Sequence, residues 1–414
     1  ARRGTAATGR SGPDRRSDRG PFAWRPERLL FSGSLRVRGN RATPRQPGHG
    51  GVGSYDRRFM THTSEPLPAR PAEAHALAVA RSLPGRRIIC TTAGRAQAAH
   101  ALAIERPDAA VTAWFLDLHP CESARDSWRP APENLRAECV ADMPTGPYDL
   151  AVVPLAKNGE AEFSRDILQA ALVNLAIGGR LVAAIDNPRD TWLHGQLAET
   201  GETVRVRPAD AAKPATVAYI VEKTREPAKI RDFSCEVVFR DRERLLTAVT
   251  RPGVFAHRRI DPGARHLLNA VDVAPETSVL DIGCGSGCVA LGIAARDPSV
   301  RVHALDSAAR AVDCTRRGAT RNGLANVTVA LEARGRVPDP GSWDLALANP
   351  PYYSDFRLAE LFVESARLAL APGGTLLVVT KQPTWYVENL PRMWKNVARE
   401  DVKGYHLIEA VRPG

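Results

Sequence analysis

The sequence predicts an α/β protein built from two tandem copies of one doubly wound unit, preceded by a disordered basic arm. Three observations support this: an ordinary globular composition, an internal repeat and a leader whose composition differs from the rest. Apolar residues make up 43% of the 414 residues and charged residues 25%, which argues against global disorder, collagen and coiled coil. A chain of this length has room for two domains.

The positive charge of the chain is concentrated in its first 59 residues. They carry 14 arginines and four acidic residues, whereas the other 355 residues hold 43 basic and 42 acidic side chains. They also contain ten glycines and no apolar period, so they cannot bury enough surface to offset the entropy of ordering. We expect residues 1–59 to be disordered. They could be a non-native leader before a start at Met60, a phosphate-attracting arm or a transit peptide.

An internal repeat defines the two domains, which we expect at 60–230 and 231–414. Tyr148–Ile185 aligns on Trp343–Thr380 without a gap, at an offset of 195 residues. Each piece reads as a strand, a loop, an amphipathic helix, a Gly-Gly turn and a second strand. Upstream, an offset of 191 lays residues 88–103 over 279–294. Such alternation of strands and helices predicts a mostly parallel sheet in each copy, with ligand sites at the carboxyl ends of the strands.

The two copies differ where a ligand would bind. After its first predicted strand the second copy reads Asp281-Ile-Gly-Cys-Gly-Ser-Gly287, whereas the first reads Cys90-Thr-Thr-Ala-Gly-Arg-Ala96. Glycines allow sharp turns and close approach to a ligand, and only one of the three survives in the first copy, where larger side chains would fill the space. We therefore expect the first domain to have lost its cofactor.

The glycine loop of the second copy predicts a nucleoside site. A strand ending in Asp281 runs into the loop and then into a helix, so that backbone N–H groups face a ligand. The spacing departs from the G-x-G-x-x-G of dinucleotide sites. Asp306, at the end of the next strand, is placed to accept hydrogen bonds from ribose hydroxyls, as in other nucleotide folds. The loop glycines are Gly283, Gly285 and Gly287.

Other candidates near this loop are less specific. Either Glu332 or Arg334, after a predicted strand at 327–331, is expected to contact an adenine, and the sequence leaves both open. Cys284 and Cys288 lack further ligands at metal spacing, so we interpret them as small buried side chains. Seven cysteines without a C-x-x-C pair favour a reducing cytoplasm and predict no metal site.

A second motif, Asn349-Pro-Pro-Tyr352, follows the predicted strand Trp343–Ala348. Two prolines fix the loop and remove two donors, so the turn presents acceptors, namely the Asn349 side-chain oxygen and the Pro350 carbonyl. These would accept the N–H bonds of an exocyclic amine and orient it for in-line methyl transfer. Tyr352 would stack on the base.

Together, the glycine loop, Asp306 and the Asn-Pro-Pro-Tyr turn resemble the class I S-adenosylmethionine-dependent methyltransferases that act on an amino nitrogen. Two fused domains, the first degenerate, resemble more narrowly the bacterial ribosomal RNA guanine-N2 methyltransferases of the RsmC and RlmG type. Pro252–Phe255 and Ile260–Gly263 are similar to that family's entry into the catalytic domain. The resemblance covers about Arg87 to Pro413.

The resemblance implies a cofactor, S-adenosyl-L-methionine, and roles for individual residues. It assigns Asn349, Pro350 and Tyr352 to the target guanine. Two departures from the family pattern stand out, since Tyr353-Ser354-Asp355 replaces a His and a Gly, and Ala264 replaces a Ser or Thr. The residues that it assigns to the cofactor are Asp281, Gly283, Gly285, Gly287, Asp306 and Gly263.

The predicted function is therefore transfer of a methyl group to the N2 amine of a guanosine in ribosomal RNA, with the first domain docking the RNA. Two alternatives stay open. One is methylation of another amino nitrogen, on adenine N6 or protein glutamine N5, and the other is a non-catalytic assembly factor that binds ribosomal RNA. We expect a cytoplasmic monomer whose partner is ribosomal RNA or a ribosomal subunit. No stretch of about 18 apolar residues predicts a membrane span.

Overall fold

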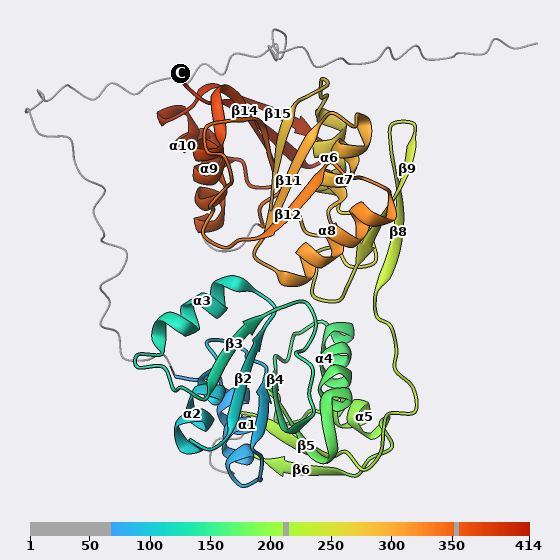
Figure 1. Cartoon of the computed structure of the whole chain (residues 1–414). Helices are drawn as coiled ribbons and strands as arrows, with labels where there is room; N and C mark the ends of the chain where they lie inside the picture. The colour runs from blue at the N-terminus through green and yellow to red at the C-terminus, as the bar shows by residue number, and fades with distance from the viewer. Residues whose placement is uncertain (1–67, 210–214, 352–355) are drawn as a thin grey trace, which may run out of the picture.

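The computed structural model describes residues 68–209, 215–351 and 356–414 (Figure 1). The predicted arm at 1–59 lies outside these residues. The described part forms two seven-stranded sheets, each with helices on both faces, and a two-stranded hairpin. The predicted fold class, two doubly wound α/β units in tandem, is confirmed.

The first sheet has the strand order β3-β2-β1-β4-β5-β7-β6. The five strands β1 to β5 are parallel, and β7 runs antiparallel to both of its neighbours. The strands are β1 (Arg87–Cys90), β2 (Ala110–Phe115), β3 (Leu135–Cys139), β4 (Tyr148–Leu155), β5 (Leu175–Ile185), β6 (Val204–Pro208) and β7 (Val217–Glu222). The helices are α1 (Pro71–Arg81), α2 (Gln97–Glu105), α3 (Leu118–Ser127), α4 (Ala161–Asn174) and α5 (Trp192–Ala198).

The second sheet repeats this order as β12-β11-β10-β13-β14-β16-β15. Its strands are β10 (Ser278–Ile282), β11 (Arg301–Asp306), β12 (Val327–Leu331), β13 (Trp343–Ala348), β14 (Leu370–Thr380), β15 (Lys395–Val402) and β16 (Tyr405–Val411). Its helices are α6 (Pro262–Ala270), α7 (Cys288–Arg296), α8 (Ala309–Arg321), α9 (Arg357–Ala369), α10 (Thr384–Asn389) and the 3-10 turn η1 (Leu390–Arg392).

The strand registers confirm the internal repeat. In the first sheet Ile88 pairs with Leu150, and in the second Val279 pairs with Leu345, which reproduces the offsets of 191 and 195. The Gly-Gly turn is placed differently from the prediction, because Gly178 lies inside β5 with a φ of 82°. Its counterpart Gly373 lies inside β14 with a φ of 85°. Only glycine adopts such a conformation without strain.

Alternate residues of each strand pack against helices on opposite faces, as expected for a parallel sheet covered on both sides. In the first unit, Ile88 packs with the face covered by α1, α2 and α3. The neighbouring Ile89 packs with the face covered by α4 and α5. The second unit has one core under α6 and α7 and another under α9 and α10.

A hairpin of β8 (Cys235–Asp241) and β9 (Arg244–Thr250) connects the two units. Its Phe239 and Leu246 are buried in the core beneath α6 and α7, so the hairpin is part of the second unit. The boundary expected at residue 230 falls between β7 and β8.

Figure 1 shows the two units one above the other, with α3 and α4 of the lower unit facing the upper. No helix in the described ranges is long and apolar enough to cross a membrane.

Candidate active site

The predicted glycine loop links β10 to α7 and has an unusual backbone. Gly283, Gly285 and Gly287 have φ angles of 75°, 55° and 80°, in the left-handed region that other residues rarely adopt. A Cβ atom on Gly283 would lie 2.8 Å from the Phe362 ring, and one on Gly287 would lie 2.8 Å from Thr315 Oγ1. Both glycines are therefore required by space as well as by conformation. At Gly285 a Cβ would meet no atom of the described residues within 4 Å.

Asp306 lies at the carboxyl end of β11, beside the loop. Its Oδ2 accepts a 2.9 Å hydrogen bond from the Gly285 N–H, and its Oδ1 accepts a 2.8 Å bond from the Ala308 N–H. Burial raises the pKa of Asp306, and these backbone N–H bonds partly counter the effect. The side chain is half-buried, so its carboxylate retains acceptor capacity for a further donor.

Asp281 lies on β10 immediately before the loop and is almost fully buried, with 3% of its surface exposed. Its Oδ2 accepts a 3.1 Å hydrogen bond from the Ala290 N–H in α7. Burial raises the pKa of Asp281 to about 7, and the charge of Asp306 adds to this shift. A cation that binds near such a buried acid favours the ionised carboxylate and so lowers its pKa.

Asn349 and Pro350 follow β13 directly, one strand away from the glycine loop, because β13 pairs with β10. The Asn349 Nδ2 donates a 2.7 Å hydrogen bond to Asp261 Oδ2. Gly263 lies against the same pair, since a Cβ on Gly263 would be 2.9 Å from Asn349 Oδ1. Tyr352, the predicted stacking residue, lies outside the described residues.

The two candidates for an adenine contact are placed differently. The Glu332 N–H donates a 2.9 Å hydrogen bond to the Asp306 carbonyl, so Glu332 is beside the ribose candidate. Arg334 instead reaches across to the first unit, where its Nε is 2.6 Å from Glu122 Oε2 and Asp126 also lies near.

The corresponding loop of the first unit is blocked by one of its own side chains. Glu73, on α1, is fully buried and its carboxylate accepts hydrogen bonds from the Thr92 hydroxyl and from the backbone N–H groups of Ala93 and Ala98. Burial raises its pKa. These donors lie in the loop before α2 and in the first turn of α2, where an anionic ligand group would bind. Glu73 therefore occupies the donors that a cofactor would need.

The first unit also contacts the chain segment that follows Asp306. The Leu118 N–H donates a 2.8 Å bond to the Ser307 carbonyl, and the Ala309 N–H donates one of 2.8 Å to the Leu116 carbonyl. Asp117, two residues beyond β2, accepts a bond from the Ser307 hydroxyl. The first unit thus holds the backbone directly after the ribose candidate.

Arg310, in the first turn of α8, is the most buried cation of this interface, with a 3% exposed side chain. It lies 2.5 Å from Asp166 Oδ2 on α4 and donates hydrogen bonds to the Ala141 and Pro252 carbonyls. Burial lowers the pKa of the Arg310 guanidinium, and the charge of Asp166 opposes this shift. Its guanidinium also stacks over Phe163. Sequence patterns did not predict this residue, because its partners come from distant segments.

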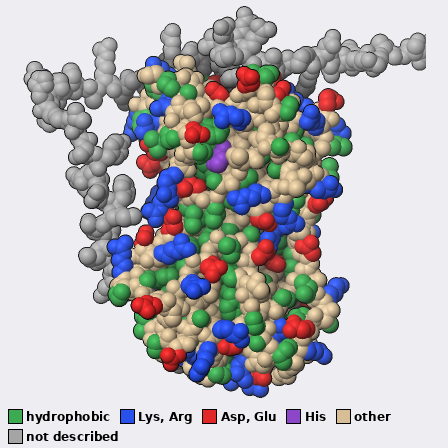
Figure 2. Space-filling model, viewed as in Figure 1, with side chains coloured by type: hydrophobic (Ala, Val, Ile, Leu, Met, Phe, Trp, Pro, Cys, Tyr) green, Lys and Arg blue, Asp and Glu red, His purple; other side chains and the backbone are tan. Residues whose placement is uncertain are grey.

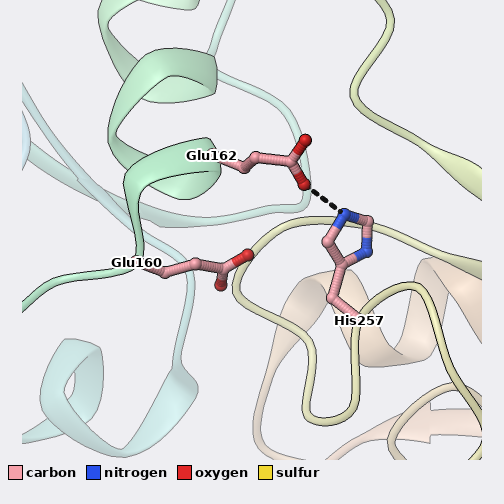
Figure 3. Close-up of side chains that lie close together, drawn as sticks. All are labelled: Glu160, Glu162 and His257. Atoms are coloured by element: carbon pink, nitrogen blue, oxygen red, sulfur yellow. Dashed lines mark hydrogen bonds and ion pairs between the residues drawn. The ribbon is translucent and has the colours of Figure 1, made fainter.

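Figure 3 shows three further side chains that meet at the same interface, Glu160 and Glu162 at the start of α4 and His257 on the opposite loop. Their ligand atoms lie within 4.8 Å of one another, a spacing that could hold a metal ion. Glu162, however, accepts two hydrogen bonds from the Arg258 guanidinium, of 2.7 and 2.9 Å. Glu160 accepts one from the Gly253 N–H. The Arg258 guanidinium supplies a positive partner for Glu162, so we interpret the cluster as an ion-pair contact between the units.

Two arginines that precede β10 form ion pairs at this interface. Arg251 pairs with Asp142 and Asp313, and Arg258 pairs with Glu162. Figure 2 shows acidic and basic side chains interspersed over the visible face, with no broad basic area. A mixed surface of this kind favours local rather than long-range attraction of a polyanion.

Comparison with known proteins relates this arrangement to methyltransferases. Residues 245–409 match the family model described as Methyltransferase small domain. The chain is 32% identical over 172 residues to Ribosomal RNA small subunit methyltransferase C of Pseudomonas entomophila, covering 40% of this chain and 51% of that protein. It is 25% identical over 281 residues to the protein of that name in Pseudomonas putida, covering 66% and 82%. The chain thus spans about half the length of most of the curated relatives it matches.

A solved structure covers both units. It is described as the T. thermophilus 16S rRNA N2 G1207 methyltransferase (RsmC) in complex with AdoMet and guanosine. The TM-score is 0.68 at 20% sequence identity, over 83% of this chain and 92% of the other. This likeness shows that the two chains share their tandem fold.

Proposed function

We propose that this chain is a ribosomal RNA guanine-N2 methyltransferase of the RsmC type that uses S-adenosyl-L-methionine. One observation carries the proposal. The acceptor Asn349 and the cofactor candidates Asp281 and Asp306 lie at the carboxyl ends of the adjacent strands β13, β10 and β11. Ligands of doubly wound sheets bind at this edge. The names of the curated relatives and the guanosine bound to the structural relative support the choice of substrate.

The residues present fit the cofactor. A Cβ would meet neighbouring side chains at Gly283 and Gly287, whereas at Gly285 no atom of the described residues lies within 4 Å of it. The backbone thus forms a cradle that a nucleoside can enter. Asp306 would accept the ribose hydroxyls, and Asp281 would supply negative charge opposite a cationic ligand. We assign the adenine contact to Glu332 rather than Arg334, because Glu332 is bonded to the Asp306 backbone. When bound, S-adenosylmethionine supplies a methyl group on a sulfonium sulfur that leaves as a neutral thioether once the amine nitrogen takes the methyl carbon.

The chain's own part in the reaction is to orient the amine. Asn349 Oδ1 and the Pro350 carbonyl would accept its two N–H bonds, which points the nitrogen lone pair toward the methyl group. As positive charge develops on the nitrogen, both oxygens stabilise it. Tyr352 would hold the base by stacking. The surplus proton then passes to solvent, so no strong general base is required.

The first unit would serve as a rigid docking partner for the RNA, since Glu73 fills its own cofactor cradle. Its contacts with Ser307 and Arg310 also hold the second unit in place. We propose that the chain acts in the cytoplasm as a monomer on ribosomal RNA or a ribosomal subunit.

The substitution Asn349→Ala tests the assignment. We expect it to abolish transfer while leaving the dissociation constant for S-adenosylmethionine unchanged, because Asn349 would touch the amine rather than the cofactor. Asp297→Asn is a control, since Asp297 precedes β11 at the opposite edge of the sheet. Among the described residues its side chain bonds only to Ser299. A large loss of cofactor affinity in Asn349→Ala would contradict the assigned role.

A further inference from the structure

Asp261 makes a direct contact with the residue proposed to hold the amine. Its Oδ2 accepts the 2.7 Å hydrogen bond from Asn349 Nδ2 and a second, of 3.1 Å, from the Ala264 N–H. The second bond caps α6, because Asp261 is the residue that precedes its first turn. The helix start therefore fixes the carboxylate, and the carboxylate in turn meets the Asn349 amide.

We propose that Asp261 is a positioning residue that sets which end of the Asn349 amide faces the substrate. An ionised carboxylate accepts hydrogen bonds and donates none, whereas an amide has one end of each kind. Only the Nδ2 end of Asn349 can therefore bond to Asp261. Oδ1 is left as the acceptor for the amine, which is the orientation that the proposed function requires. The inference rests on that function and adds to it the residue that orients its central acceptor.

Gly263 makes the contact possible. A Cβ on this residue would lie 2.7 Å from Asp261 Oδ2 and 2.9 Å from Asn349 Oδ1, closer than such atoms approach without displacing one another. Any larger residue would push the two side chains apart. The resemblance assigned Gly263 to the cofactor, and the geometry supports a further reason for a glycine there.

The first unit supplies an internal comparison. Its helix α1 begins at Pro71, 191 residues before Pro262 of α6, so Arg70 and Ala72 correspond to Asp261 and Gly263. At the offset of 195, Pro154 corresponds to Asn349. Arginine has no acceptor and proline has no side-chain amide, and α1 lacks a side-chain cap. All three members of the contact are thus replaced in the copy whose cofactor cradle is blocked, which indicates that they operate as a unit.

The variant Asp261→Asn tests the inference with little risk to the fold, because asparagine caps helices as well as aspartate. An asparagine can donate as well as accept, so it no longer dictates the orientation of Asn349. We expect kcat to fall roughly 10- to 100-fold, as for other misplaced catalytic groups. KM for the RNA and the dissociation constant for S-adenosylmethionine should change less than about twofold, because neither binding site is removed. Asp297→Asn, the same chemical change at the other edge of the sheet, should leave all three constants unchanged.

A second readout does not depend on activity. In the full chain labelled with ¹⁵N-asparagine, the Asn349 side-chain NH₂ signal is identified by its loss in Asn349→Ala. We expect Asp261→Asn to move this signal and Asp297→Asn to leave it in place. An unmoved signal, or an unchanged kcat in an active protein, would overturn the inference. A wild-type protein that transfers no methyl group would count against the proposed function instead, while the NMR comparison would still decide the role of Asp261.

Discussion

The Asp306 carboxylate accepts a 2.9 Å hydrogen bond from the backbone N–H of Gly285, which joins the end of β11 to the glycine loop after β10. The two residues are 21 positions apart in sequence. Gly285 has a φ of 55°, in the left-handed region. The same glycine donates its backbone N–H to the carboxylate. The bond thus fixes the geometry of the proposed ribose site before any ligand arrives.

The second unit has this geometry, whereas in the first unit Glu73 occupies the corresponding donors. Calorimetry of the full chain should therefore give one molecule of S-adenosylmethionine bound per chain. Asp306→Ala should weaken binding by about 10- to 100-fold, the loss expected for hydrogen bonds to a charged group. Glu73→Gln, which alters the blocked cradle of the first unit, should leave the affinity unchanged. A stoichiometry of two would contradict the loss of the first site.

Cofactor binding should release a proton below about pH 7. Burial raises the pKa of Asp281 to about 7, so the acid is largely protonated in the free protein at pH 6. A cationic ligand favours the ionised form and lowers this pKa. Affinity should therefore rise with pH up to about 7 and then level off. Calorimetry at pH 6 in two buffers of different ionisation enthalpy measures the proton release, and Asp281→Asn should remove it. Equal heats in both buffers for the wild-type protein would contradict the prediction.

Replacement of Arg310 by methionine should destabilise the protein by about 3–5 kcal/mol. It leaves the partly buried Asp166 carboxylate without its partner and removes the bonds to two backbone carbonyls. Arg321, on the same helix, pairs with Glu236 where both side chains are more than half exposed. Arg321→Met should therefore have no measurable effect. Urea unfolding of the two variants against the wild type checks both expectations. Equal midpoints for Arg310→Met and the wild type would contradict the role of the interface.

Glu409→Gln should stabilise the protein increasingly as the pH rises. Glu409, on β16, is 8% exposed, and its Oε2 finds no hydrogen-bond partner among the described residues. Burial raises its pKa to about 7, so the folded state binds a proton more tightly than the unfolded state. The wild-type protein therefore loses stability between about pH 4.5 and 7. Thermal melts should give the variant an advantage on the order of 1–2 kcal/mol at pH 8 and little at pH 5. The exposed Glu400→Gln serves as control, and an advantage independent of pH would contradict the explanation.

Local patterns were sufficient to predict the fold. The sequence offsets of 191 and 195 between the two copies appear again in the strand registers. They could be found because the hydrophobic period and the turn residues of each element lie within one short stretch of sequence. The glycine loop and the Asn349 turn were predicted for the same reason, since each is a short motif after an apolar strand. The hairpin of β8 and β9 was missed, although only Arg242 and Glu243 separate its two strands.

Contacts between distant segments could not be predicted in this way. Asp261 and Asn349 are 88 positions apart, and Glu162 and His257 are 95 apart. No period or spacing connects such residues. The Asp261–Asn349 contact follows from the fold of the second unit, and the Glu162–His257 contact from the docking of the two units. The sequence therefore identified the acceptor Asn349 but not Asp261, the carboxylate that orients it. The same limit applies to Arg251 and Arg258, whose ion pairs with acids of the first unit become evident only in the structure.

The most direct test of the central claim is to incubate the full chain with methyl-labelled S-adenosylmethionine and undermodified small and large ribosomal subunits, or their naked RNAs. Digestion of the RNA then identifies the labelled nucleoside. We predict N2-methylguanosine from one of the four substrates, with no label in the Asn349→Ala protein. Label in methyladenosine or in ribosomal protein, or none from a protein that binds the cofactor, would contradict the claim.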